Sequence, residues 1–190
     1  MEDKKINELI QKKMIEESIR QDFEYTFSDR VDRYLEVKPH DIVPYTYFSA
    51  ASTECSYLFR DGHFYGCIAL TQAVAEALVR FMCKINFRRA GKVFGNNVEK
   101  LSNRGFISNV VKGHLLEIWT MRDDYHHLNP NVATDRHTLQ ELAREKTRLL
   151  VEVEKEVFRR TIVDGNINPE NPKYWNINRN QAQVFLRIQP

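Results

Sequence analysis

The stretch HFYGCIALTQAVAEALVRFMCKINF, residues 63–87, decides the fold of this chain. Apolar side chains occupy most of its helical circumference, which is typical of a helix buried on all sides. Ala69, Ala73 and Ala77 recur at intervals of four residues and form a ridge of small side chains that lets a second helix approach closely. The stretch therefore predicts the central helix of a bundle.

The segments on either side of this helix also have helical rather than strand periodicity. An Asp61-Gly62 turn separates it from the preceding helix, because glycine suits a left-handed helix end. Strand-like alternation is seen only near the end of the chain, at Val184, Leu186 and Ile188, which predict a short strand or extended segment. The fold class is therefore all-α, an up-and-down bundle of four or five helices. The predicted helices span residues 3–20, 22–35, 45–60, 63–87, 97–103, 108–128 and 134–162.

Prolines divide the chain into an arm, a core and a tail. Lys38–Pro44 holds two prolines, which interrupt regular structure and separate the first helices from the rest. We expect an N-terminal helical arm over residues 1–43, a helical bundle over 44–163, and a short extended C-terminal tail over 164–190 packed on the bundle.

The composition excludes several classes of protein. A net charge of +2 over 190 residues is too small for a polybasic nucleic-acid coat, so a nucleic acid would have to contact a local patch. The three cysteines are Cys55, Cys67 and Cys83, and no two of them form a C-x-x-C pair, which argues against a disulfide framework. The sequence shows no signal-type leader and no apolar run of membrane-span length, so we expect a cytoplasmic protein without membrane contact.

The most informative chemistry lies in WTMRDDYHHLNP, residues 119–130. Arg122 is always charged, and His127 titrates near neutrality, the two properties that cleavage of a phosphodiester requires. Arg122 continues the apolar stripe of Ile118 and Tyr125, where a charge must be paired or face a cleft. His127 lies in the last helical turn before Pro130, where the helix dipole favours an imidazolium that can act as a general acid.

A second pair lies within the central helix. Glu76 and Arg80 are one helical turn apart, and a carboxylate in so apolar a helix needs a partner. Plainer interpretations remain open for both motifs. Glu76 and Arg80 can form an intrahelical ion pair with no further role, and Arg122 can pair with Asp123 or Glu117 while His127 is an ordinary surface residue.

Together the two motifs resemble the HEPN superfamily of α-helical domains. The similarity rests on Glu76-x-x-x-Arg80 in one helix and on Arg122-Asp123-x-x-x-His127 at the end of a later one, and it covers roughly residues 45–163. It implies a metal-independent endoribonuclease that acts as a homodimer, with a motif helix from each subunit facing a shared cleft. Cleavage by 2′-hydroxyl attack needs an acid and a base, and two copies of His127 supply both.

The resemblance also assigns supporting roles and partners. Arg122, His127 and Asp123 would be catalytic, with Glu76 and Arg80 in support and His126 as a substitute for His127. RNA is the expected substrate, and a toxin or defence component, with an antitoxin or regulatory protein as partner, fits the same family. The alternatives are a catalytically inactive HEPN-like dimeric interaction or nucleotide-binding module, and a plain helical adaptor in which the motif is coincidental.

Neither a metal nor a cofactor is expected. His126, His127 and His137 with the neighbouring aspartates suggest a metal site, but adjacent histidines project about 100° apart on a helix and cannot share an ion there. The sequence contains no phosphate-binding glycine loop and no His-Glu-x-x-His motif.

Overall fold

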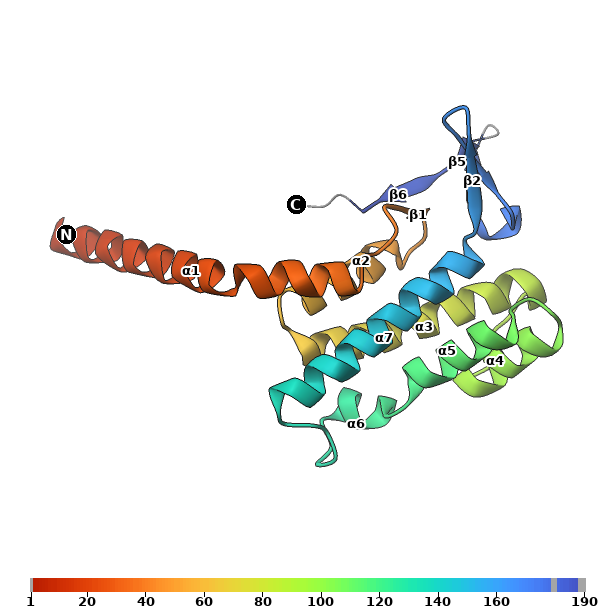
Figure 1. The fold of residues 1–190 in the computed structure, drawn as a ribbon, viewed down its shortest axis with the longest axis horizontal. Helices are drawn as coiled ribbons and strands as arrows, with labels where there is room; N and C mark the ends of the chain where they lie inside the picture. Colours follow the sequence, from red (N-terminus) through yellow and green to blue (C-terminus); the bar gives the residue numbers. More distant parts are fainter. Residues whose placement is uncertain (1, 179–180, 188–190) are drawn as a thin grey trace.

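A computed structural model describes residues 2–178 and 181–187 of the chain. It is mostly helical, with short strands gathered on one side of the bundle, which confirms the all-α prediction (Figure 1). The helices are α1 (Glu2–Glu36), α2 (Ser49–Arg60), α3 (Phe64–Phe87), α4 (Phe94–Asn103), α5 (Asn109–Trp119), α6 (Arg122–His127) and α7 (Arg136–Val157). The strands are β1 (Ile42–Pro44), β2 (Arg160–Val163), β3 (Asn166–Pro169), β4 (Ile177–Asn178), β5 (Gln181–Ala182) and β6 (Val184–Leu186), and a 3-10 turn spans Pro172–Tyr174.

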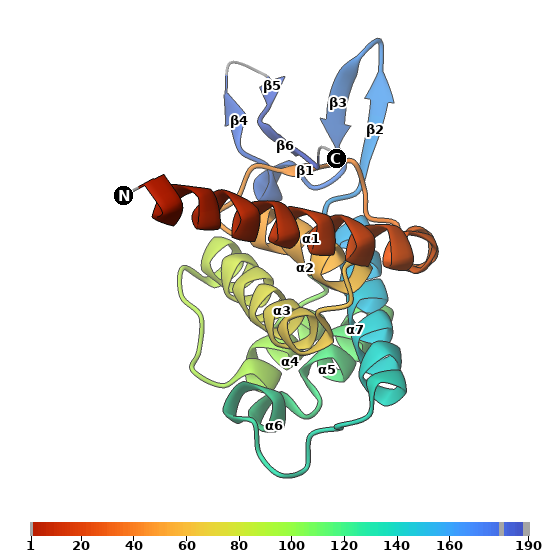
Figure 2. The same ribbon diagram turned by 90° about the vertical axis from the view of Figure 1, so that its left-hand side faces the viewer.

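Helix α3 forms the centre of the bundle, as its apolar sequence predicts. Its side chains Ile68, Leu78 and Met82 are fully buried, and α2, α4, α5, α6 and α7 all pack against it (Figure 2). Among the described helices, α3 also has the length and apolar composition of a membrane span. The same composition is found in the core helix of a globular bundle, and most of its apolar segment is buried between neighbouring helices.

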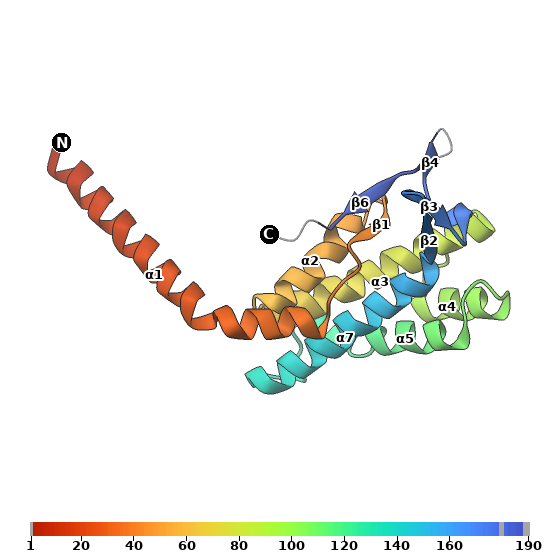
Figure 3. The ribbon, with the colours of Figure 1, turned by 45° about the horizontal axis from the view of Figure 1, so that its top comes forward.

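Helix α1 is a single arm that projects away from the bundle (Figures 1 and 3). The sequence predicts two helices here, and the structure instead contains one continuous helix, since no proline interrupts residues 2–36. Its C-terminal part is fixed to the end of α2. Arg30 forms an ion pair of 3.0 Å with Asp61, and Arg33 Nε donates a 2.8 Å hydrogen bond to the Arg60 carbonyl.

The tail returns to the bundle through short antiparallel pairings. Strand β6 pairs with β1, with Phe185 opposite Val43, so the predicted extended segment lies beside the linker between arm and bundle. Ile188, predicted to continue the alternation, lies outside the described residues. Helix α7 ends at Val157, earlier than the predicted residue 162, because residues 160–163 form the β2 strand that pairs with β3.

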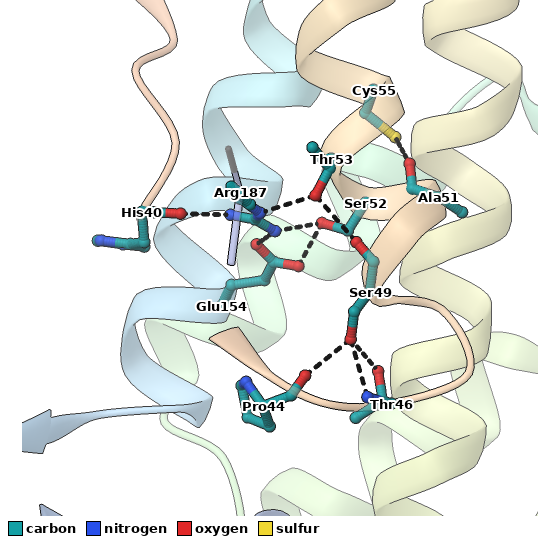
Figure 4. Close-up of polar contacts among 10 residues, drawn as sticks. All are labelled: His40, Pro44, Thr46, Ser49, Ala51, Ser52, Thr53, Cys55, Glu154 and Arg187. Atoms are coloured by element: carbon teal, nitrogen blue, oxygen red, sulfur yellow. Dashed lines mark hydrogen bonds and ion pairs between the residues drawn. The ribbon is translucent and has the colours of Figure 1, made fainter. Parts of the chain in front are cut away.

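A buried ion pair secures this tail (Figure 4). Arg187 Nη2 lies 2.6 Å from Glu154 Oε2 of α7, and both side chains are 2% exposed. Arg187 also donates to the Ser52 and Thr53 hydroxyls of α2, and Ser52 Oγ donates to the other Glu154 oxygen at 2.5 Å. The two charged groups are hydrogen-bonded to each other and to the two hydroxyls, and such pairing is what allows charges to be buried.

Candidate functional site

The candidate site is built on α6, which is separate from the helix before it. The sequence predicts one helix over residues 108–128, and this is wrong, because α5 ends at Trp119 and α6 begins at Arg122. Met121, between them, has a left-handed backbone with φ of 57°. Arg122 therefore does not continue the apolar stripe of α5, but stands in the first turn of a new helix.

Two buried side chains from other helices hold this break. Lys146 of α7, 3% exposed, donates from Nζ to the carbonyls of Glu117, Ile118 and Thr120 at 2.9–3.1 Å. Gln72 of α3 donates from Nε2 to the Ile118 and Thr120 carbonyls at 3.1 and 2.9 Å. The carbonyls that end α5 are thereby satisfied without a continuing helix. Burial lowers the pKa of Lys146 to about 8.

Helix α6 is fixed to the bundle by its one buried side chain, Tyr125. The Tyr125 ring packs 6.2 Å, centroid to centroid, from the ring of Tyr65 of α3, and its hydroxyl accepts a 3.4 Å hydrogen bond from the Ala133 amide. At the other end, Asn129 donates from its amide to the Asp124 carbonyl and from Nδ2 to the Asp124 carboxylate. Because Tyr125 points into the bundle, the other α6 side chains lie on the surface or where α6 meets α3.

Arg122 lies at the edge between surface and core. Its guanidinium carbon is 5.4 Å from the centroid of the Trp119 ring, and Nη1 lies 2.9 Å from the Asp123 carboxylate. The side chain is 30% exposed, and its Nε–H is buried with no hydrogen-bond partner in the described part of the chain. Asp123 thus orients the guanidinium, and the pKa of Asp123 is lowered, first by its hydrogen bond with Arg122.

The structure brings His126, rather than His127, to the face of α6 that Arg122 occupies. Residues four apart lie on one side of a helix. Burial and then the charge of Arg122 lower the pKa of His126, while a hydrogen bond with the Ala69 backbone and the charge of Glu76 act in the opposite direction. His126 is therefore close to α3. His126 and His127 are both exposed, and the charge of each acts on Asp123.

The second motif is placed beside this site. Glu76 and Arg80 form the intrahelical ion pair that their spacing predicts, with an N–O distance of 2.5 Å. The charge of Glu76 acts to raise the pKa of His126, and the charge of Arg80 acts to lower the pKa of Tyr47. Arg122 and Glu76 thus both act electrostatically on His126, while Asp123 and His127 are exposed residues of α6.

The site lies on an open surface. A cavity of about 630 Å³ lies at the C-terminal end of α7, between His40, Arg159 and Arg160, and none of the α6 residues lines it. A surface group of this kind suits an extended ligand or a second protein rather than an enclosed small molecule.

Metal and thiol chemistry gain no support from the side-chain positions. Within residues 2–178 and 181–187, no group of three or more His, Cys, Asp or Glu side chains is arranged to hold a metal ion. All three cysteines are buried and unpaired, and burial raises the pKa of Cys67 to about 11, so its thiol stays protonated at neutral pH.

Sequence reasoning missed the residues that shape the site from a distance. Lys146 and Gln72 stabilise the break before Arg122. The signal in the sequence is that a lysine and a glutamine occupy positions that helical periodicity makes core-facing, but it does not indicate which backbone they bind. No family model, curated protein or solved structure matches the chain.

Proposed function

We propose that the chain is a metal-independent endoribonuclease of the HEPN type, with its active site on α6. One observation carries the proposal. Arg122 is held half-buried by Trp119 and Asp123, its Nε–H has no hydrogen-bond partner among the described residues, and a histidine stands one turn along the same helix face. A fixed guanidinium with a free donor beside an imidazole is the pairing that phosphodiester cleavage uses.

The reaction assigns each group a task. A neutral histidine removes the proton from an RNA 2′-hydroxyl, and the 2′-oxygen forms a bond to phosphorus. The bond from phosphorus to the 5′-oxygen breaks, and a protonated histidine gives its proton to that oxygen. The products are a 2′,3′-cyclic phosphate and a 5′-hydroxyl. Arg122 stabilises the charge that develops on the phosphoryl oxygens.

The acid and the base come from two copies in this proposal. Adjacent helical residues project about 100° apart, so His126 and His127 of one chain cannot flank the same phosphorus atom in line. The lowered pKa of His126 keeps it neutral at neutral pH, which suits the base. His127, at the C-terminal end of α6, suits the acid, supplied by a second copy across a two-fold axis.

Cleavage of an end-labelled single-stranded RNA in EDTA tests the proposal. Wild-type protein should give cyclic-phosphate ends, and Arg122→Ala, His126→Ala and His127→Ala should each lose most of the activity. His137→Ala, which removes an exposed histidine outside α6, is the matched control and should keep it. Undiminished cleavage by an Arg122→Ala, His127→Ala double variant would sink the assignment.

A second candidate is a catalytically inactive HEPN-like interaction module. The observation that favours it is the Arg122–Asp123 ion pair, which engages a guanidinium nitrogen that a phosphate would otherwise bind. A folded wild-type protein that cleaves no RNA but binds a protein partner through α6 would favour this function.

A further inference from the structure

The arm α1 exposes a long row of apolar side chains outside the bundle. Seven large ones in its first two thirds are between 46% and 67% exposed, namely Ile6, Leu9, Ile10, Met14, Ile15, Ile19 and Phe23. A single exposed leucine is ordinary on a protein surface, but seven large apolar side chains within one stretch of helix leave an apolar area that another molecule can cover.

The bundle does not cover this surface. Every hydrogen bond and ion pair made by residues 4–26 in the described structure stays within α1, as between Gln21 and Glu17 or Lys12 and Glu16. The first contact of this kind with the bundle is that of Arg30 with Asp61. Figures 1 and 3 show the same segment extending away from all other helices. An isolated helix is marginal in water, so its stability calls for a partner.

The charges on the arm are divided between its two halves. Residues 4–13 carry four lysines and one glutamate, a net charge of +3. Residues 16–24 carry four acidic residues and one arginine, a net charge of −3. The boundary falls at Met14 and Ile15, in the middle of the exposed apolar row. A helix with this distribution is complementary to a reversed copy of itself.

We propose that residues 4–24 of α1 pair with the same residues of a second copy of this chain in an antiparallel arrangement. Each basic half then lies against the acidic half of the other copy, and the two-fold axis passes near Met14 and Ile15. Such a contact is isologous, with one surface facing itself. A parallel pair would place lysine beside lysine and glutamate beside glutamate, which disfavours it.

One side of α1 suits this packing. Ile6, Leu9 and Phe23 lie on it together with Lys13 and Glu16, because these residues are spaced by three, four or seven positions, whereas Ile10 and Ile19 project to opposite sides of the helix. In the antiparallel arrangement Lys13 of one copy lies beside Glu16 of the other, and Ile6 beside Phe23. An anionic lipid surface is a poorer occupant, because the acidic half of the arm would be repelled by it.

Charge reversal in the full-length chain tests the pairing by sedimentation equilibrium. Wild type should sediment as a dimer or a multiple of it. Lys12→Glu with Lys13→Glu, or Glu16→Lys with Glu17→Lys, should shift it towards half that mass, and all four changes together should restore the wild-type mass. Arg89→Glu with Lys92→Glu makes the same charge change on exposed residues outside the arm and should leave the mass unchanged.

Mixing the two double variants supplies a second readout. A homodimer of either double variant would bring like charges together. A heterodimer of the two variants brings charges of opposite sign together, so the mixture should form it. Circular dichroism checks that each variant keeps its helix content. A wild type that stays monomeric, a quadruple variant that stays dissociated, or binding of monomeric wild type to phosphatidylserine vesicles would each overturn the proposal.

The pairing is independent of the ribonuclease proposal, since it uses none of the α6 residues. Loss of RNA cleavage in an α6 variant that still dimerises concerns the active site alone. If α6 also forms a two-fold contact, the two contacts either share one axis in a dimer or build a larger assembly, and the sedimented mass separates these cases.

Discussion

The Arg187 guanidinium and the Glu154 carboxylate form an ion pair of 2.6 Å with both side chains 2% exposed, 33 residues apart in the sequence. The pair joins the tail to α7, and the Ser52 hydroxyl bonds to both partners. Burial makes the two charges interdependent, because either one alone would be left desolvated without its counterion.

Removing one partner should therefore destabilise the fold strongly. Arg187→Ala should lower the free energy of unfolding by about 3–5 kcal/mol, measured by urea denaturation. Arg148→Ala breaks an exposed ion pair with Glu145 and should change it by less than about 1 kcal/mol. Replacing both charges, with Glu154→Leu and Arg187→Met, should recover much of the loss. Equal effects of the buried and exposed variants would contradict this account.

The lowered pKa of Lys146 predicts that the free energy of unfolding depends on pH. Its pKa of about 8 in the folded chain lies below its ordinary value of 10.5, so the unfolded chain binds more protons between these values. Stability should consequently rise with pH across this interval, by at most about 3 kcal/mol from this group. The rise should be smaller in Lys146→Met. Parallel stability curves for the two proteins between pH 8 and 10 would argue against a lowered pKa.

The same lysine should control the start of α6. Lys146→Met leaves the carbonyls of Glu117, Ile118 and Thr120 without their buried donor. We expect a loss of about 2–4 kcal/mol, since several buried acceptors lose a charged partner. Lys155→Met, on the exposed side of α7, is the matched control and should have little effect. Amide exchange of residues 118–124 should accelerate only in the Lys146 variant.

The surroundings of His126 predict its titration. Burial, and then the charge of Arg122, should place its pKa below the ordinary 6.5. Arg122→Gln removes a positive charge and should raise the pKa, whereas Glu76→Gln removes a negative charge and should lower it further. Proton NMR of the histidine ring measures both shifts. Unchanged values in both variants would mean that His126 does not face Arg122 and Glu76.

Substitution of alanine for Gly62 and for Gly95 should change the stability of the chain in opposite directions. Gly62 has φ of +79°, a conformation that costs an L-residue about 1–2 kcal/mol, so Gly62→Ala should lower the melting temperature. The new methyl group would also lie 2.6 Å from Arg136 Nη2, which must move. Gly95, inside α4, has open space around it, and Gly95→Ala should stabilise the chain by up to about 1 kcal/mol. Thermal denaturation of both variants checks the difference in sign.

Much of the helical layout follows from the sequence alone. The all-apolar circumference of residues 64–87 identifies the central helix, and glycine at position 62 ends α2 because it tolerates a left-handed backbone. Asp135 caps α7 by accepting from the Thr138 amide at 2.8 Å. The Glu76–Arg80 ion pair likewise follows from spacing. Each of these features depends on residues within one or two helical turns, so local patterns are sufficient to predict them.

Contacts between distant residues decided the rest. Residues 108–128 have an unbroken helical pattern, yet the helix divides at Met121 because Lys146 and Gln72, 26 and 48 residues from Thr120, satisfy the carbonyls at the break. That division moves Arg122 off the α5 stripe and places His126, not His127, beside it. The ion pair between Arg187 and Glu154 is also invisible in the sequence, since nothing local tells a buried arginine from an exposed one. Periodicity specifies which residues turn inward, and only the packed tertiary structure specifies which partners they meet there.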